Sequence, residues 1–166
     1  SIPVQSLITQ AGVQEFLLAH KNEDAKNIVL KYAGKVDFDL APITQQIELR
    51  QKARKKISSF ITPYTLLLPK LFEQSTHQEV AKYKATLING NTYLDATTGL
   101  GIDTFFIGKN FKRIVCLEAD PRHAEILVHN YKQLDVHAEI HHTTLEEFLK
   151  INKAVFDVIY IDPDRR

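Results

Sequence analysis

The residues best suited to chemistry lie in one short segment, residues 95–103, with the sequence DATTGLGID. An apolar run precedes the segment and a helical pattern follows it, so we expect a turn between a strand and a helix. Gly99 and Gly101 have no side chain, which lets a ligand approach the backbone closely. The N–H groups at the start of the next helix favour an anion such as an amino-acid carboxylate. Asp95 could bind the ammonium group of the same amino acid.

The charges around these glycines indicate the kind of ligand. A dinucleotide-binding turn requires a small residue at position 104, where this chain has Thr104. The carboxylate of Asp103 would also repel a pyrophosphate. S-adenosylmethionine has no phosphate and carries a positive sulfonium and an ammonium group, so acidic residues favour it over NAD. The alternative interpretation is a tight turn in which both glycines serve packing alone.

Glu118 ends the next expected strand, 19 residues after Gly99. At this position a carboxylate can accept hydrogen bonds from both ribose hydroxyls of a nucleoside. Asp120 follows closely, but aspartate is strongly preferred as a helix N-cap, so we interpret it as a cap rather than a ligand.

Two threonines follow the third expected strand, where a residue that contacts adenine could lie. The alternative is structural, because Thr143 with Glu146, or Thr144 with Glu147, would make a capping box at a helix start. Both interpretations stay open. We expect seven residues to bind the cofactor: Asp95, Thr97, Gly99, Gly101, Asp103, Glu118 and Thr144.

A second chemical signal lies near the end of the sequence. Residues 156–161 form a nearly continuous apolar run, which is typical of a parallel strand buried on both faces. The run leads into Asp162, Pro163, Asp164 and Arg165. A carboxylate at the end of a strand, beside a proline-fixed turn, is well placed for catalysis, although a plain strand end is the alternative. We expect Asp162, Pro163 and Arg165 to be catalytic.

An α/β fold must position these residues. We expect strands over residues 92–96, 113–118, 136–141 and 156–161. Helices are expected from residue 103 and over residues 121–133 and 144–151. Such alternation implies parallel βαβ units. The sequence therefore predicts a Rossmann-like domain with about four strands over residues 89–166.

Residues 1–88 have helical patterns instead, and we expect them to form a helical N-terminal domain. Helices are expected over residues 25–33 and 42–57, with an irregular stretch over residues 58–71. Another helix should begin at Ser75 and Thr76, with Gln78 and Glu79 completing capping boxes, and end near residue 88.

Basic residues cluster in the second half of the helix expected over residues 42–57. A net charge of +1 gives no overall attraction to nucleic acid, so any basic surface must be local. Such a run is most often a solvated face, but it could also bind an RNA backbone. The cluster consists of Arg50, Lys52, Arg54, Lys55 and Lys56.

The composition argues against several other classes of protein. Cys116 is the single cysteine, so an internal disulfide is excluded and a cytoplasmic location is expected. His141 and His142 are adjacent on an expected strand and point to opposite faces, so we expect no metal site. No apolar run has the length needed to cross a bilayer, and no membrane partner is expected.

Over about residues 75–166 the chain resembles class I methyltransferases. The signature D-A-T-x-G-L-G-x-D is similar to that of bacterial small-subunit rRNA guanine-N2 methyltransferases and of the RNA-cap guanine-N2 group. The ending I-D-P-x-R-R and the helix before the signature resemble more closely a little-characterised methyltransferase family. Its longer members carry a C-terminal THUMP-like domain. The matching helix positions are Gln74, Ser75, Ala81, Lys82, Lys84 and Ala85.

This resemblance implies roles for particular residues. Asp95, Gly99 and Gly101 match the cofactor loop, and Glu118 matches the ribose carboxylate. Asp162 and Pro163 match the first half of the catalytic motif [N/D]-P-P-x. Two positions depart from the family pattern: Asp164 replaces the second proline, and Thr144 stands where an aspartate is usual.

The resemblance also implies an activity, namely methylation of an exocyclic amine of an RNA base, with guanine N2 favoured. Asp162 and the backbone carbonyl beside Pro163 would orient the amine. A uridine-C5 reaction would need a cysteine nucleophile, for which Cys116 lies in the wrong place. Such folds have about seven strands, so we expect an N-terminal fragment of the enzyme. The alternatives are a non-catalytic RNA-binding module with a vestigial cofactor fold, or an amino-methyltransferase acting on DNA or protein.

Overall fold

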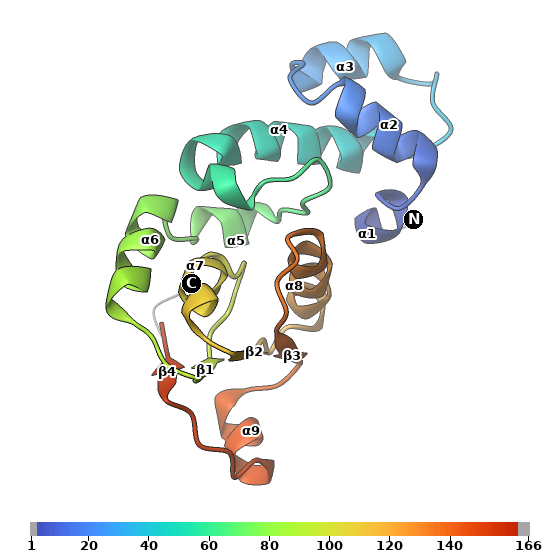
Figure 1. Ribbon diagram of the computed structural model, residues 1–166. Coiled ribbons are helices and arrows are strands. Elements are labelled where there is room, and N and C mark those ends of the chain that lie inside the picture. Colours follow the sequence, from blue (N-terminus) through green and yellow to red (C-terminus); the bar gives the residue numbers. More distant parts are fainter. Residues whose placement is uncertain (1–2, 163–166) are drawn as a thin grey trace.

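A parallel sheet of four strands forms within residues 3–162, the part of the chain that the computed structural model describes (Figure 1). The strands are β1 (Thr92–Asp95), β2 (Arg113–Leu117), β3 (Glu139–His141) and β4 (Val158–Tyr160). Their spatial order is β3-β2-β1-β4, so β4 lies beside β1. Asp95 pairs with both Cys116 and Tyr160, so these three strands end at the same level.

The outer strands are shorter than the sequence predicts, and local hydrogen bonds explain why. Val136 donates its N–H to the carbonyl of Tyr131 at 2.8 Å and so closes a helix end instead of starting β3. Asp157 lies just before β4, and its carboxylate accepts from the N–H groups of Asn91 and Thr92 at 2.7 and 3.1 Å. Its side chain thus fixes the entry to β1.

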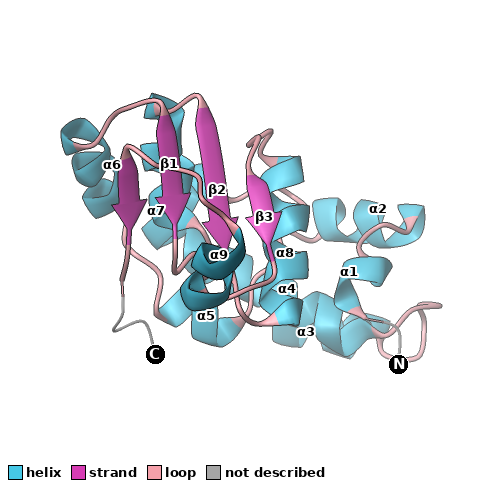
Figure 2. Cartoon of the chain, turned by 90° about the horizontal axis from the view of Figure 1, so that it is seen from below, coloured by secondary structure: helices cyan, strands magenta, loops and turns pink. Residues whose placement is uncertain are grey.

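Helices cover both faces of the sheet, as parallel strands require. Figure 2 shows α9 (Leu145–Ile151) in front of the sheet, with α7 (Ile102–Ile107) and α8 (Pro121–Gln133) behind it. The side chain of Asp120 accepts from two N–H groups in the first turn of α8, which confirms its role as the cap. Each of these helices follows a strand, so α7, α8 and α9 begin at the carboxyl edge of the sheet.

Helices also make up most of the chain before β1, as predicted. They are α1 (Val4–Leu7), α2 (Ala11–Ala19), α3 (Ala25–Tyr32), α4 (Leu40–Ile57), α5 (Pro69–Glu73) and α6 (Gln78–Leu87). The sequence missed α5, because its five residues begin at Pro69, inside a stretch that was expected to be irregular. In residues 3–162, no helix is both long enough and apolar enough to cross a membrane.

The start of α6 differs from the expected capping boxes. His77 caps the helix, and its ring nitrogen accepts from the N–H of Glu79 at 3.2 Å. Ser75 donates instead to the carbonyl of Phe72, and Thr76 donates to Asp103 at 2.9 Å. The prediction of Ser75 and Thr76 as caps was wrong because both hydroxyls bind groups outside α6.

Two buried amide side chains attach an extended segment to α4 and α8. Gln46 makes two hydrogen bonds of 2.9 Å with the backbone N–H and carbonyl of Leu67. Asn130 does the same with Leu66 at 2.8 Å. Each amide satisfies backbone groups that would otherwise be buried without a partner. The segment thereby joins α4 to the layer of helices on the sheet.

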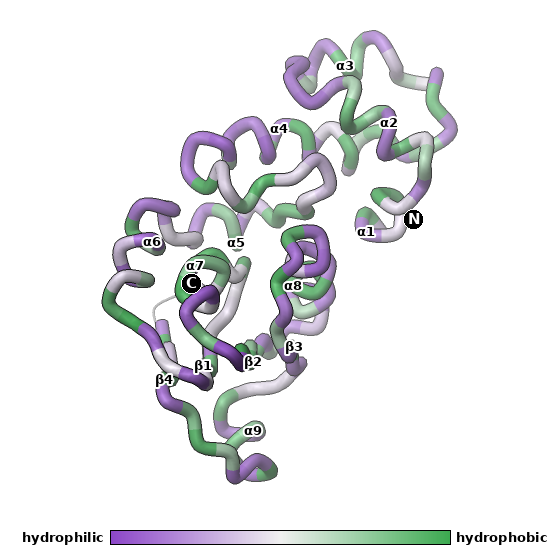
Figure 3. Tube along the Cα trace, in the orientation of Figure 1, coloured by the Kyte–Doolittle hydropathy of each residue, from purple (hydrophilic) through white to green (hydrophobic). Residues whose placement is uncertain are grey.

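The main apolar core extends from α4 to the sheet. It contains Ile57 and Phe60 as well as Tyr93 and Tyr131, so the early helices and the sheet share it. In Figure 3, α7 is largely hydrophobic, whereas much of α4 is hydrophilic. A smaller cluster around Phe148 packs α9 on the other face.

Candidate functional site

A cleft of about 440 Å³ lies at the carboxyl edge of the sheet. Its walls are the segments that follow β1, β2, β3 and β4, together with the end of α5 and the first turn of α8. Four residues predicted to bind the cofactor line it with the predicted catalytic Asp162. They are Thr97, Gly99, Glu118 and Thr144.

Glu118 is held at the cleft by two backbone N–H groups. One carboxylate oxygen accepts from Gly99 at 3.2 Å and the other from Asp120 at 2.8 Å. The carboxylate therefore spans the turn after β1 and the turn after β2. A carboxylate oxygen has a second lone pair, so both oxygens keep the capacity to accept from a ligand.

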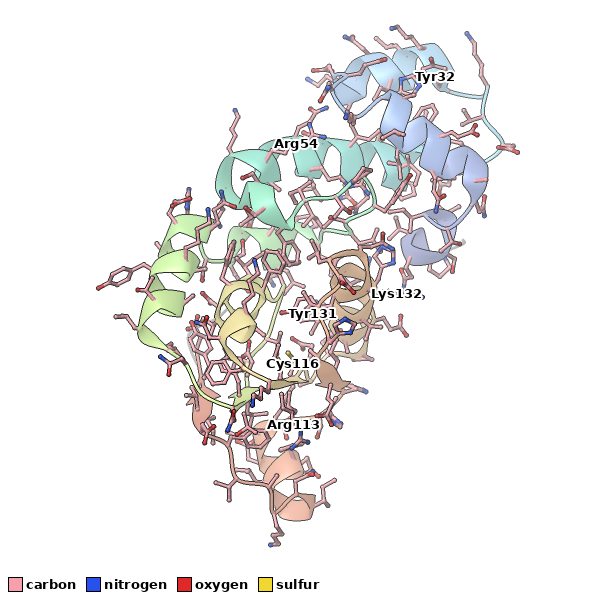
Figure 4. The ribbon with its side chains drawn as sticks, in the orientation of Figure 1. Tyr32, Arg54, Arg113, Cys116, Tyr131 and Lys132 are labelled. Atoms are coloured by element: carbon pink, nitrogen blue, oxygen red, sulfur yellow. The ribbon has the colours of Figure 1, made fainter. Side chains whose placement is uncertain are left out.

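The two glycines of the turn have different surroundings. Gly99 adopts φ +58° and lines the cleft. Gly101 adopts φ +87°, and a Cβ there would lie 2.6 Å from the hydroxyl of Tyr131. That hydroxyl donates to the carbonyl of Gly101 at 2.8 Å, and Tyr131 points from α8 toward α7 (Figure 4). Gly101 therefore allows α8 to pack against the turn, whereas Gly99 is the glycine that lines the cleft.

The carboxylate of Asp95 is buried beneath the turn. One oxygen accepts from the N–H of Thr97 at 3.0 Å, and the other accepts from the hydroxyl of Thr104 at 2.5 Å. Only 1% of the residue is exposed. Asp95 thus acts on the shape of the turn from below.

Asp103 lies in the first turn of α7, and its side chain contacts α6 and β4. Its carboxylate accepts from the hydroxyls of Thr76 and Tyr160 at 2.9 and 3.0 Å, and pairs with Lys84 at 3.3 Å. Burial lowers the pKa of Lys84, but the hydrogen bond to Tyr160 and the charge of Asp103 outweigh it and raise that pKa overall. Asp103 therefore joins α6, α7 and β4.

Thr144 caps α9 and lies at the cleft. Its hydroxyl accepts from the N–H of Glu147 at 3.2 Å, so it caps α9. The residue is exposed and also lines the cleft. Its cap is confirmed, and its contact with a ligand stays a prediction.

Asp162 lies where β4 reaches the cleft. Its N–H donates to the hydroxyl oxygen of Thr97 at 2.8 Å, so the end of β4 is tied to the turn after β1. Pro163 and Arg165, the other predicted catalytic residues, lie outside the described residues.

The family model described as "Conserved hypothetical protein 95" matches residues 71–164, which are 94 of the 166 residues. The chain belongs to the conserved hypothetical protein 95 family. The match covers the cleft and α6 as well as the sheet. No curated protein matches the chain.

Solved structures show the fold of this member of the conserved hypothetical protein 95 family. A "putative methyltransferase from Porphyromonas gingivalis W83" superposes with a TM-score of 0.69 at 21% identity, over 84% of this chain and 36% of that one. The α/β fold is therefore the Rossmann-like fold of class I methyltransferases. The chain spans about a third of the length of that relative.

Two other structures match less well. One is a Pyrococcus abyssi tRNA (uracil-54, C5)-methyltransferase in complex with S-adenosyl-L-homocysteine, with a TM-score of 0.47 at 19% identity, over 63% of this chain and 25% of that one. The other is an O-methyltransferase from Bacillus cereus, with a TM-score of 0.40 at 17% identity, over 82% of this chain and 60% of that one.

The basic cluster of α4 does not form one surface, which corrects the expectation from sequence. Arg50 is 3% exposed, and its Nε donates to the carbonyl of Thr65 at 2.8 Å. Burial is the main cause that lowers its pKa to about 10. Arg50 therefore stabilises the segment after α4 and is too deeply buried to bind RNA.

The other four basic residues differ in exposure. Arg54 (Figure 4) donates to the side chain of Asn22 at 3.0 Å, and Lys56 donates to the carbonyl of Phe72 at 3.1 Å. Lys52 and Lys55 are exposed, with Lys52 3.5 Å from Glu48. These two lysines are the cluster members that α4 presents most openly to solvent.

Sequence reasoning missed several side chains of the cleft, among them Leu71, Gln74 and His123. Leu71 and Gln74 come from the end of α5, a helix that the sequence did not predict. His123 lies in the first turn of α8, and its position three residues after the Asp120 cap could have indicated it. Within residues 3–162, no three His, Cys, Asp or Glu side chains gather closely enough to hold a metal ion. Burial raises the pKa of the Cys116 thiol, which disfavours it as a nucleophile.

Proposed function

We propose that this chain forms the S-adenosylmethionine-binding part of a methyltransferase. The observation that carries the proposal is the placement of Glu118, which the N–H groups of Gly99 and Asp120 fix at the cleft. In Rossmann-like folds a carboxylate at the end of the second strand binds the ribose hydroxyls. Its orientation is set before a ligand arrives, so little ordering is needed on binding.

The cleft suits this cofactor in size and charge. Its volume of about 440 Å³ lies within the range of roughly 300–1,000 Å³ that is typical of small-molecule sites. Gly99 allows close approach of a ligand to the backbone, and Thr97 and Thr144 offer hydroxyl groups. The buried carboxylate of Asp95 adds negative charge near the turn, which favours a cationic ligand over a phosphate.

The proposed reaction is methyl transfer to an exocyclic amine of an RNA base, with guanine N2 favoured. S-adenosylmethionine supplies an electrophilic methyl group when it is bound. Asp162, at the same cleft, accepts hydrogen bonds from the amino hydrogens and holds the nitrogen lone pair toward that methyl group. The carbonyl beside Pro163 assists it, and Arg165 contacts the RNA. Proximity and orientation then provide much of the rate acceleration.

RNA is the proposed partner, and it would meet the protein near exposed basic residues. Lys52 and Lys55 are the proposed contacts of α4, since Arg50 is buried and Arg54 and Lys56 bind other parts of the chain. A base in structured RNA must leave its stack to enter such a cleft.

The test uses the full-length protein with labelled S-adenosylmethionine and separate pools of RNA, DNA and protein. We expect label in RNA, and mass spectrometry of digested nucleosides should identify an N-methylated base. Label in DNA or protein instead would assign a different substrate. Cofactor binding without transfer to any pool would support a non-catalytic module, and absence of cofactor binding would overturn the proposal.

A further inference from the structure

The end of β4 is held by a side chain where the sheet itself stops. β1 and β4 pair through Asp95 and Tyr160, and the N–H of Ala96 donates to the carbonyl of Tyr160 at 2.9 Å. Beyond this bond β1 leaves the sheet to form the glycine turn. In a continued ladder, a backbone carbonyl would accept from the next N–H of β4. The hydroxyl oxygen of Thr97 takes that place and accepts from the N–H of Asp162 at 2.8 Å.

Thr97 is itself fixed by a series of buried hydrogen bonds. Its N–H donates to one oxygen of Asp95 at 3.0 Å, and the hydroxyl of Thr104 donates to the other. The hydroxyl of Tyr93 lies 2.9 Å from that of Thr104. Because Thr104 has one hydroxyl hydrogen and gives it to Asp95, Tyr93 must donate to Thr104.

The residues of this series within the core are shielded from water, and each hydroxyl donates in one direction, toward Asp95. Tyr93 and Thr104 are 0% exposed, and Asp95 is 1% exposed. Burial raises the pKa of Tyr93 far above its usual value, so its hydroxyl remains a donor. Buried and fully paired networks of this kind hold side chains in one arrangement. The position of Thr97 is thus determined by residues of β1 and α7.

We propose that Thr97 is a positioning residue for Asp162, and that Asp95, Thr104 and Tyr93 act through Thr97. The inference rests on the proposed catalytic role of Asp162. Thr97 also lines the cleft, so one residue touches the cofactor site and fixes the backbone that carries the catalytic carboxylate. Asp95 then affects methyl transfer from below the turn, without touching the cofactor.

The test compares three variants of the full-length protein. Thr97→Val keeps the shape of threonine but removes the acceptor oxygen, while Thr97→Ser keeps the oxygen. Thr98→Val is the matched control, because Thr98 is the neighbouring threonine and its buried hydroxyl donates to the carbonyl of Asp95 at 3.3 Å. Each variant is measured for amide hydrogen exchange at Asp162, for S-adenosylmethionine affinity and for single-turnover methyl transfer.

We expect Thr97→Val to speed exchange at Asp162 by about ten-fold, the effect of losing one hydrogen bond. At saturating cofactor, methyl transfer should fall by about ten-fold or more. Thr97→Ser should restore both properties, and Thr98→Val should leave the Asp162 amide protected. Unchanged exchange in Thr97→Val, or a serine variant as defective as the valine one, would overturn the inference. Failure of the wild type to bind the cofactor would refute the proposed function alone. Hydrogen exchange at Asp162 does not need the cofactor, so it still tests whether Thr97 holds the Asp162 backbone.

Discussion

The carboxylate of Glu118 and the backbone N–H of Gly99 meet at 3.2 Å, although they belong to turns that follow different strands. This bond joins the turn after β1 to the turn after β2 and places the carboxylate at the cleft. The second bond, from the N–H of Asp120, stops the carboxylate from rotating. Backbone N–H groups of two turns therefore fix the acidic side chain of the cleft.

Glu118→Ala should weaken binding of S-adenosylmethionine to the full-length protein by about 1–3 kcal/mol, because a charged hydrogen-bond acceptor is removed. Isothermal calorimetry measures the change. Glu139→Ala is the control, since Glu139 pairs with Arg113 on the surface at 2.6 Å and should leave the affinity unchanged. Equal affinity of the Glu118 variant and the wild type would show that the ribose binds elsewhere.

Gly101→Ala should destabilise the fold by about 1–3 kcal/mol, because the new Cβ meets Tyr131 and the backbone has positive φ. Two other glycines separate these causes. Gly34 also has positive φ, +73°, but a Cβ there has open space, so Gly34→Ala should cost less. Gly12 has open space inside α2, and Gly12→Ala should be neutral or stabilising by about 0.5–1 kcal/mol.

Denaturant unfolding at equilibrium ranks the three glycine variants. Equal reductions of the unfolding free energy in Gly101→Ala and Gly34→Ala would mean that the contact with Tyr131 adds nothing to the backbone strain.

The stability provided by Lys84 should depend on pH in the alkaline range. The pKa of Lys84 is raised in the folded protein, so its contribution is complete below the unfolded value of about 10.4 and disappears as pH rises through the folded value. The difference in unfolding free energy between wild type and Lys84→Met should therefore shrink as the pH rises above about 10.4. A difference that is constant over this range would refute the contribution of the Asp103 ion pair.

Sequence reasoning located the strands, the glycine turn and Glu118 because these depend on local chemistry. The capping aspartate before α8 was also predicted correctly. Side-chain direction could not be predicted in the same way. Asp95 turns inward because Thr104, nine residues later, offers it a hydroxyl, and Arg50 is buried because the carbonyl of Thr65 accepts from it. Both outcomes depend on contacts that exist only after the chain has folded.

The exposed lysines of α4 should contribute to RNA affinity through charge alone. Replacing Lys52 and Lys55 by glutamine should weaken binding and reduce the slope of log affinity against log salt by about 1–2, since each lysine that neutralises a phosphate adds about one unit to the slope. The matched control is Lys150→Gln with Lys153→Gln, which removes two charges at the far end of α9. An unchanged slope in the α4 variant would identify its lysines as a solvated face.

Asp162→Ala should reduce methyl transfer by about 100-fold while leaving S-adenosylmethionine affinity nearly unchanged. The reason is that the proposed role of the side chain is to orient the amine, whereas Glu118 and the glycine turn are the proposed contacts of the cofactor. Asp162→Asn keeps an acceptor oxygen of the same shape and should retain part of the activity. Single-turnover transfer to total RNA, with full-length protein saturated with cofactor, measures the chemical step separately from binding.

Arg165 provides a contrast within the same motif. As a proposed RNA contact, its replacement by alanine should raise the apparent KM for RNA and change the saturated rate much less. A lower saturated rate in Asp162→Ala, together with a higher KM for RNA in Arg165→Ala, would separate orientation of the amine from binding of the RNA. Normal turnover in Asp162→Ala would remove Asp162 from the chemistry, because a group that orients the nucleophile cannot be removed without a change in rate.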